Sequence, residues 1–183
     1  VYDWYDIKPG DKQGRLWGSA IKRKDKIVQI IKDRLLNRRR LSSFSMNEKS
    51  CKKFWIELCK FRLRFIYCYP NAAFEFAKFL KFSNINGNSL NLKAIICTGE
   101  ILFPHQRNLL NQIFHCPIIN EYGSTENGII AFECKKGKMH LMSHNIFLEV
   151  VDSNFRPVNT GEEGNLLITE LNSKFIPFIR YFL

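Results

Sequence analysis

The segment 120–126, with the sequence Asn-Glu-Tyr-Gly-Ser-Thr-Glu, carries the side chains of this chain that are best suited to chemistry. Tyr122 offers a flat ring on which a base can stack, while Ser124 and Thr125 offer hydroxyls to an anionic oxygen. Glu126 offers a carboxylate to a cation or to a sugar hydroxyl. The segment therefore indicates a site for a nucleotide with its metal ion. A polar turn between two strands, without a ligand, is the alternative.

Two polar turns of this kind follow predicted strands. The apolar run Pro117–Asn120 is a predicted strand that leads into a turn at Gly123, where the missing Cβ lets the backbone turn sharply and approach a ligand. Leu92–Cys97 is a second apolar strand, and it runs directly into Thr98-Gly99-Glu100. Ligands of parallel sheets bind beyond the carboxyl ends of the strands, so both turns are expected to open onto one site.

The elements around these turns alternate between strand and helix. Phe65–Tyr69 is a further predicted strand, and Pro70 and Pro104 suit the first turns of two helices. Strand, helix, strand, helix and strand with short connections indicate parallel βαβ units. After Glu126 the strand-like segments are separated only by short turns, as in an antiparallel meander; they are 128–133, 139–142, 146–151, 165–171 and 178–182.

The amino-terminal part is predicted to add a short strand and two helices. Arg15–Ala20 is the strand, ending in a tight turn. The first helix runs from Arg23 to about Arg38, with one buried face whose apolar residues are Ile27, Ile30, Ile31 and Leu35. Ser45 and Glu48 are spaced as a capping box for the second helix, whose apolar stripe contains Cys51, Phe54, Trp55, Leu58 and Phe61.

Together these patterns predict an α/β fold: a parallel βαβ sheet with flanking helices, followed by an antiparallel β meander. Residues 1–127 are expected to form the α/β portion and 128–183 the β-rich portion of the same domain.

Composition limits the class of protein. Of 183 residues, 45% are apolar and 16 are Phe, which favours a packed core over disorder. No apolar run approaches the about 18 residues that a transmembrane helix needs, and the start of the sequence has no signal-peptide pattern. The six cysteines occur singly, without a C-x-x-C pair, which favours free thiols in the cytoplasm.

The net charge of +11 raises the alternative of a basic nucleic-acid-binding module. The only dense basic block is Arg38–Arg40, and no recognised binding motif accompanies it. A lysine-rich surface explains the charge without nucleic acid, and a positive field would also attract ATP or coenzyme A.

The motif Asn-x-Tyr-Gly-x-Thr-Glu after a strand resembles the nucleotide-binding motif of adenylate-forming enzymes, the acyl-CoA synthetase and adenylation-domain superfamily. Within it, the chain resembles the phenylacetate–CoA ligase and capsular-polysaccharide CapK-type branch. That narrower resemblance rests on an ordered set of segments: Ile7-Lys8-Pro9-Gly10-Asp11, Trp17-Gly18-Ser19, Tyr69-Pro70, Leu92-Lys93, Thr98-Gly99-Glu100, Ile130-Ala131, Glu133-Cys134, His140-Leu141, Gly161-Glu162-Glu163-Gly164 and Pro177-Phe178-Ile179-Arg180-Tyr181.

The resemblance implies a role for each motif residue. Tyr122 would stack on adenine, Asn120 would read the base edge, Thr125 would contact the α-phosphate and Glu126 would hold Mg²⁺ on the phosphates. Gly99 and Glu100, beside Thr98, would line the pocket shared by adenine and the acyl group. The implied reaction joins a small carboxylic acid to AMP from ATP, releases pyrophosphate and passes the acyl group to coenzyme A.

Some parts of the family pattern lie outside the sequence. The upstream phosphate loop, the Gly-Asp that follows Ile179-Arg180-Tyr181, and the mobile carboxy-terminal lid domain with its catalytic lysine are absent. Within the sequence, Asn165 stands where Glu is usual, and His144 stands where the branch often has an acidic residue. The chain is therefore interpreted as a central fragment of an adenylation domain. A domain that binds nucleotide or a partner without catalysis is the alternative.

A zinc site is a further, less favoured interpretation. Cys134 and His140 flank a predicted turn and are two possible ligands, with His144 or Cys116 completing the set. Because the spacing is loose and the set is half complete, coincidence is the simpler explanation.

Overall fold

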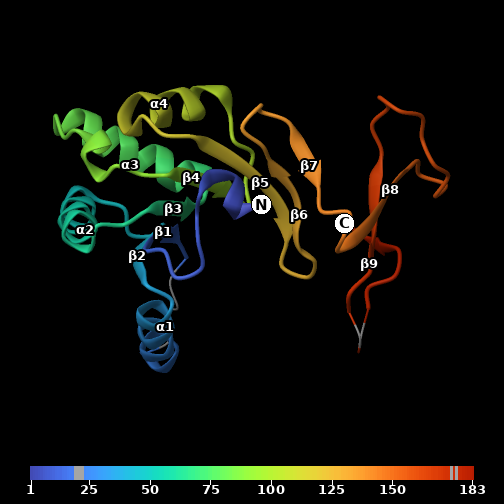
Figure 1. Ribbon diagram of the computed structural model, residues 1–183, viewed down its shortest axis with the longest axis horizontal. Coiled ribbons are helices and arrows are strands. Elements are labelled where there is room, and N and C mark those ends of the chain that lie inside the picture. The colour runs from blue at the N-terminus through green and yellow to red at the C-terminus, as the bar shows by residue number, and fades with distance from the viewer. Residues whose placement is uncertain (19–22, 174, 176) are drawn as a thin grey trace.

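The computed structural model describes residues 1–18, 23–173, 175 and 177–183 (Figure 1). Its larger sheet has seven strands in the order β2-β1-β3-β4-β5-β6-β7. Strands β1 to β5 are parallel to one another, β6 is antiparallel to β5, and β7 is antiparallel to β6. Their bounds are β1 Gln13–Trp17, β2 Arg38–Ser42, β3 Phe65–Cys68, β4 Ala94–Thr98, β5 Ile118–Ser124, β6 Gly128–Glu133 and β7 Met139–Leu141.

A second sheet of three antiparallel strands has the order β10-β9-β8. These strands are β8 Ile146–Val151, β9 Asn165–Glu170 and β10 Tyr181–Phe182. Ile130 of β6 packs with Ile146 and Ile168 in a small core of its own. The predicted fold class, a parallel sheet with flanking helices followed by an antiparallel portion, is confirmed. The strands of 128–141 extend the first sheet, so the division at residue 127 stays a prediction.

Helices α2 (Glu48–Phe61), α3 (Pro70–Phe82) and α4 (Pro104–Phe114) cover one face of the larger sheet (Figure 1). Phe76 of α3 is completely buried at the centre of this core, where its ring packs edge-on against Phe54 and parallel to Phe114. Proline at the first turn starts α3 and α4, as expected, because its fixed φ suits that position.

The opposite face is covered near its centre by the first residues of the chain. Tyr2–Tyr5 forms a 3₁₀ turn, and Tyr5 and Ile7 pack on Ile96, Ile119 and other residues of the sheet. Side chains alternate along a strand, so each central strand supplies residues to both cores. Both faces of the parallel sheet are therefore covered, as is usual for parallel sheets.

Two sequence-based expectations for the amino-terminal helices were wrong. Helix α1 (Arg23–Leu35) forms, but its apolar residues are exposed, with Ile30 at 54% and Leu35 at 79%. The helix extends away from the layer of α2 to α4 (Figure 1), so no described element covers that stripe. The capping box of α2 is formed by Asn47 and Ser50, because the helix begins at Glu48 and not at Ser45.

The segment after α1 also differs from expectation. Arg38–Ser42 forms strand β2, which lies parallel to β1 at the edge of the sheet. Of its basic block, Arg40 forms two 2.8 Å hydrogen bonds with the Asp33 carboxylate, and Arg39 stacks on Phe61. The predicted strand at Trp17 is β1; Ser19 and Ala20, in its expected turn, lie outside the described residues.

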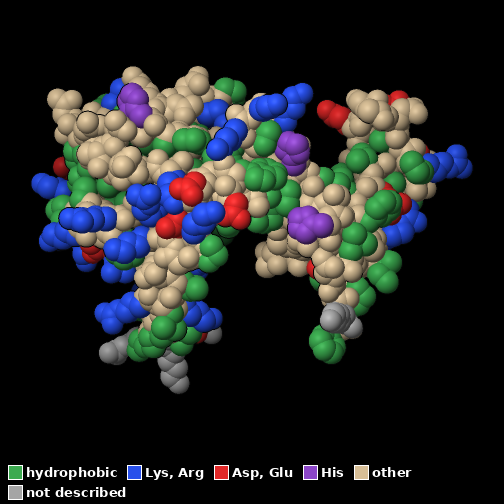
Figure 2. Space-filling view, viewed as in Figure 1, with side chains coloured by type: hydrophobic (Ala, Val, Ile, Leu, Met, Phe, Trp, Pro, Cys, Tyr) green, Lys and Arg blue, Asp and Glu red, His purple; other side chains and the backbone are tan. Residues whose placement is uncertain are grey.

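None of the described helices has the length and apolar character needed to cross a membrane. All six cysteines are free. On the face shown in Figure 2, Lys and Arg side chains are spread over the helical half of the molecule, with Asp and Glu among them near its middle. They do not gather along one groove of that face.

Candidate functional site

The two polar turns meet at the carboxyl edge of β4 and β5. The strands pair in parallel, with Thr98 opposite Glu121, which brings the turn after Thr98 next to the end of β5. A cavity of about 400 Å³ opens there. Five predicted site residues line it: Thr98, Gly99, Gly123, Ser124 and Thr125.

Close contacts with a ring and with the backbone require glycine at two positions beside the cavity, Gly99 and Gly123. Gly99 has a φ of +76°, and a Cβ there would lie 2.9 Å from the ring of Tyr69. A Cβ on Gly123 would lie 2.4 Å from the backbone oxygen of Gly128. Gly123 lies within β5, at a β-bulge, and not in the turn as the sequence suggested. β5 extends to Ser124 because β6 pairs with it, so the close approach at Gly123 is to the hairpin partner.

The remaining predicted residues do not line this cavity. Glu121 and Ile119 belong to the sheet face covered by Tyr5, so the alternation of side chains directs Asn120 and Tyr122 to the other face of β5. The Tyr122 side chain is 44% exposed there. Glu126 is exposed in the turn between β5 and β6.

Glu100 is engaged with a helix. Its Oε2 accepts a hydrogen bond of 3.1 Å from the backbone N–H of Asn71, in the first turn of α3. A carboxylate at this position also stabilises the positive end of the helix dipole. Gln106 of α4 donates to the Asn71 side chain at 2.7 Å, which ties the two helices to the Gly99 turn.

Glu133 fixes the strand that carries the motif. Its Oε2 accepts hydrogen bonds from the backbone N–H of Asn120 at 2.7 Å and from Arg107 at 2.8 Å. The carboxylate is buried, and the guanidinium balances its charge. Helix α4, β5 and β6 are thereby joined directly behind Asn120.

Sequence reasoning missed six residues of the cavity wall: Trp17, Tyr67, Tyr69, Glu121, Gly128 and Ile129. Trp17 stacks on Tyr69 with ring centroids 3.9 Å apart and on Tyr67 at 5.4 Å. Trp17 is the last residue of β1, Tyr67 and Tyr69 lie at the end of β3 and just after it, and Glu121 of β5 is opposite Thr98, the last residue of β4. The position of Trp17, Tyr67 and Tyr69 in predicted strands that lead to this edge was the signal that could have identified them.

Glu121 is the most deeply buried acid of the site, at 4% exposure. Its Oε1 accepts a hydrogen bond of 2.6 Å from the Tyr67 hydroxyl, and its Oε2 lies 3.4 Å from the Tyr2 hydroxyl. Burial raises the pKa of the Glu121 carboxyl, while the hydroxyls of Tyr67, Thr98 and Tyr2 lower it by stabilising the ionised form. Burial also raises the pKa of Tyr67, which keeps this phenol a hydrogen-bond donor to Glu121.

The zinc interpretation finds no support in the structure. Within the described ranges, no group of three or more His, Cys, Asp or Glu side chains is placed to hold a metal ion. His140 instead packs edge-on against Trp4, with ring centroids 5.6 Å apart. Cys134 closes the β6–β7 turn, where its backbone N–H donates to Lys138. The two residues therefore lack the further ligands that a zinc site requires.

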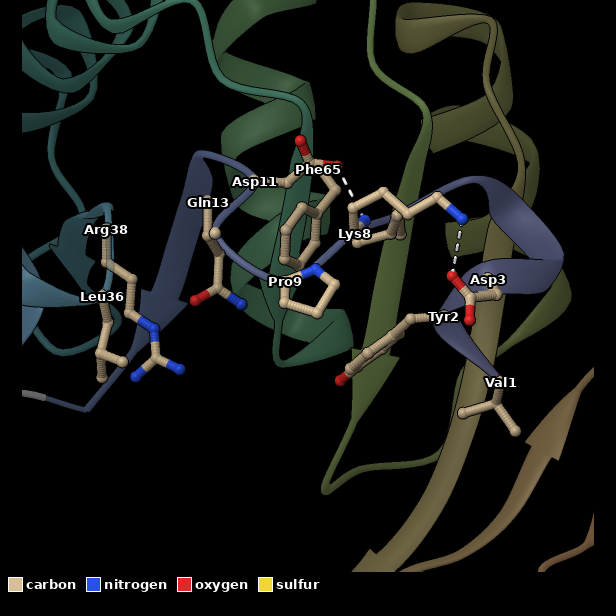
Figure 3. Close-up of a pocket in the computed structure, with 12 residues that line it drawn as sticks. Val1, Tyr2, Asp3, Lys8, Pro9, Asp11, Gln13, Leu36, Arg38 and Phe65 are labelled. Carbon is tan, nitrogen blue, oxygen red and sulfur yellow. Dashed lines mark hydrogen bonds and ion pairs between the residues drawn. The ribbon is translucent and has the colours of Figure 1, made fainter.

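A separate cavity of about 440 Å³ lies beside the first residues of the chain (Figure 3). The side chains of Tyr2, Gln13 and Arg38 face this hollow, and Lys8 closes one side through a 2.9 Å contact with Asp3. None of the motif residues lines it. The candidate site is therefore the hollow at the β4–β5 edge.

Solved structures of other proteins share the fold of this chain. No family model matches the chain. It is 29% identical over 110 residues to indoleacetate–lysine synthetase of Pseudomonas savastanoi, a match that covers 57% of this chain and 25% of that protein. A 2-hydroxyisobutyryl-CoA ligase in complex with 2-HIB-AMP and CoA superposes with a TM-score of 0.74 at 16% identity, over 98% of this chain and 43% of that one.

A second solved structure is that of the anthranilate CoA ligase AuaEII in complex with anthranoyl-AMP. It superposes with a TM-score of 0.64 at 17% identity, over 94% of this chain and 34% of that one. The chain thus spans between a quarter and less than half of the proteins it matches. It has the fold of the matching parts of these two CoA ligases.

Proposed function

We propose that this chain is the central portion of an AMP-forming ligase that activates a carboxylic acid with ATP. The observation that carries the proposal is the meeting of two polar segments, Thr98–Glu100 and 123–126, beside a cavity of about 400 Å³ at the carboxyl edge of β4 and β5. This is the edge at which parallel sheets bind ligands. The shared fold with acyl-CoA ligases supports the same assignment.

The two substrates are proposed to lie on the two sides of the β5 edge. Tyr122, exposed on the outer side, would stack on adenine, and Asn120 on the same side would read the edge of the base. The acid would occupy the cavity on the other side, with Thr98 and Gly99 in its wall. Thr125, at the mouth of the cavity, would contact the α-phosphate where the two substrates meet.

Glu126 is proposed to hold Mg²⁺. Its carboxylate is exposed in the turn next to Thr125, and among the described residues it belongs to no group of three or more His, Cys, Asp or Glu side chains that could hold a metal ion. One carboxylate together with the phosphates of the substrate is the arrangement that suits Mg²⁺, which retains several waters. The ion would neutralise charge on the phosphates.

The proposed chemistry has two steps. A carboxylate oxygen of the acid attacks the α-phosphorus of ATP, the bond from that phosphorus to the bridging oxygen breaks, and pyrophosphate leaves. The thiolate of coenzyme A then attacks the acyl carbonyl, and AMP leaves. The protein contributes mainly positioning and charge stabilisation to such steps.

The finer assignments rest on the resemblance of the sequence. We place the chain in the phenylacetate–CoA ligase and CapK-type branch, with coenzyme A as acceptor, a role in surface-polysaccharide synthesis and a cytoplasmic location. The acids named for its relatives range from 2-hydroxyisobutyrate to anthranilate and indoleacetate. The identity of the acid must therefore be inferred from the cavity of this chain.

The test is calorimetric titration of the chain with ATP and Mg²⁺. Tyr122→Ala and Glu126→Ala are each expected to weaken binding by about tenfold, or about 1.4 kcal/mol. Phe147→Ala and Glu163→Ala are matched controls, because both side chains are exposed and belong to the part of the chain that forms the second sheet, Phe147 in β8 and Glu163 in the turn before β9. Absence of saturable binding by the folded chain, or equal losses in the controls, would refute the proposal.

A further inference from the structure

We propose that the cavity at the amino ends of β1, β2 and β3 binds the phosphate group of a small phosphate monoester. Arg38 would bind the anionic oxygens of the phosphate, and Gln13 would accept a hydrogen bond from its P–O–H group. The inference does not rest on the proposed function, because this cavity lies at the other end of the parallel strands from the motif.

The position of the cavity follows from the topology of the sheet. The hollow of about 440 Å³ is lined by Gln13, Arg38 and Phe65, which are the first residues of β1, β2 and β3 (Figure 3). Thr98, beside the motif, is the last residue of β4. Because β1 to β4 are parallel, the cavity and the turn after Thr98 lie at opposite edges of the sheet. A ligand in this cavity is therefore distinct from the proposed nucleotide.

Arg38 brings to the cavity a guanidinium without a carboxylate partner in the described part of the chain. The two aspartates in the cavity wall are already engaged, with Asp3 2.9 Å and Asp11 3.0 Å from a lysine ammonium. Asp33, which lines a second hollow together with Arg38, is held by Arg40 at 2.8 Å. The guanidinium of Arg38 is half-buried, and its planar fork of N–H donors matches the oxygens of a phosphate.

A second guanidinium adds to the positive field. Arg15 follows Gln13 on the same face of β1, where it lies over two aromatic rings, and its Nε has no hydrogen-bond partner among the described residues. Burial and the charges of Arg38 and Arg40 lower the pKa of Arg15. These like charges repel one another, so an anion bound at Arg38 would relieve the repulsion.

Gln13 supplies an acceptor without a donor. Its side chain is only 6% exposed and faces the hollow beside Arg38, the residue opposite it in the pairing of β1 with β2 (Figure 3). No hydrogen bond to its Oε1 is formed by the residues that the structure describes. A buried acceptor that lacks a donor is unfavourable. A ligand with both anionic oxygens and a proton would satisfy Arg38 and Gln13 together.

A monoprotonated phosphate meets both requirements. Its anionic oxygens accept from a guanidinium, and its P–O–H group donates to an amide oxygen. Sulfate has a similar shape but carries no proton near neutral pH. The cavity is also larger than a phosphate ion, and Ile7, Leu36 and Phe65 give part of its wall an apolar surface. The phosphate is therefore expected to carry an apolar substituent.

The experiment is calorimetric titration of the chain with phenyl phosphate, inorganic phosphate and sulfate at pH 6 and constant ionic strength. At this pH about half of a phosphate monoester retains a proton. Inorganic phosphate should bind at least about tenfold more tightly than sulfate, although sulfate carries more charge, because only phosphate donates to Gln13. Phenyl phosphate should bind about fivefold more tightly again, because its ring covers apolar surface.

Three variants locate the site. Arg38→Met keeps the length of the side chain without its charge and should weaken the binding of all three anions by at least about tenfold. Gln13→Met removes the acceptor, so the preference for phosphate over sulfate should be lost. Arg39→Met is the matched control, because Arg39 lies over the Phe61 ring on the opposite face of β2, and it should change binding by less than about twofold. Circular dichroism confirms that each variant is folded.

The results have distinct meanings. Absence of saturable binding of phenyl phosphate by the folded parent chain, or equal losses in Arg38→Met and Arg39→Met, would overturn the site. Equal binding of phosphate and sulfate would overturn the role of Gln13, and inorganic phosphate binding as tightly as phenyl phosphate would overturn the monoester. Tyr122→Ala should leave the binding of all three anions unchanged. A loss in that variant would place the anion at the motif and refute the location, whereas failure of ATP binding alone would leave this inference standing.

Discussion

Replacing Tyr67 by Phe removes the shortest hydrogen bond to the buried acid at the floor of the cavity. The Tyr67 hydroxyl lies 2.6 Å from Oε1 of Glu121, which is 4% exposed. A hydrogen bond to a charged group contributes about 1.5–3 kcal/mol, and the buried acceptor is left without this donor. We expect a loss of about 2 kcal/mol, which for a chain of this length lowers Tm by about 4–8 °C.

The loss should depend on pH. The folded-state pKa of Glu121 is raised by burial above the ordinary value of 4.5. In the window between the unfolded and the folded pKa, the folded chain binds more protons than the unfolded chain, so stability falls as pH rises through it. Tyr67→Phe removes a hydrogen bond that lowers this pKa, so the pKa rises further. The difference in free energy of unfolding between parent and variant should therefore be larger at pH 7 than at about pH 4, where the carboxyl of the folded chain is protonated.

The assay is urea unfolding of the parent and the variant at both pH values. Tyr69→Phe is the matched control, because its ring also lines the cavity but its hydroxyl makes no hydrogen bond with the described residues. The control should change stability by less than about 0.5 kcal/mol. Equal losses in the two variants, or a loss independent of pH, would refute the role given to Glu121.

Two further predictions concern the framework around the site. Gly123→Ala should destabilise the chain by about 1–3 kcal/mol, because the alanine Cβ would lie 2.4 Å from the Gly128 carbonyl oxygen. An unchanged midpoint of thermal unfolding would contradict this close approach. Leu58 is completely buried, so Leu58→Ala should lower the free energy of unfolding in urea by about 2–5 kcal/mol. Ile30 is exposed, so Ile30→Gln should change it by less than about 0.5 kcal/mol. Similar losses in the two variants would show that α1 packs as tightly as α2.

Much of the fold could be predicted because its signals are local. Pro70 and Pro104 start their helices where the sequence placed them, since a fixed φ and a missing N–H suit only the first turn. The apolar runs before Thr98 and Asn120 form strands because they are short and buried on both faces. Where the signal was weaker, as in the basic segment Arg38–Ser42, the strand was missed.

The apolar spacing of α1 shows the limit of such reasoning. Periodicity predicts that a helix has an apolar face, but not that another element covers it. The spacing of Ile27, Ile30 and Ile31 correctly predicted a helix, yet all three side chains are exposed. The same kind of pattern in α2 is buried at Phe54 and Leu58, because α2 lies on the sheet and α1 does not.

The sequence by itself determined the residue types of the motif and the position of both polar turns at the ends of strands. Only the tertiary structure decided which of these residues share a cavity. Parallel pairing of β4 with β5 sets Thr98 beside Glu121, and the pairing of β1 with β3 brings the Trp17 and Tyr67 rings together. The physical reason is that side chains alternate across a strand, so Tyr122 and Glu121, neighbours in sequence, face opposite sides of the sheet. Which side holds the cavity depends on contacts with residues more than 50 positions away, such as Tyr67 and Trp17.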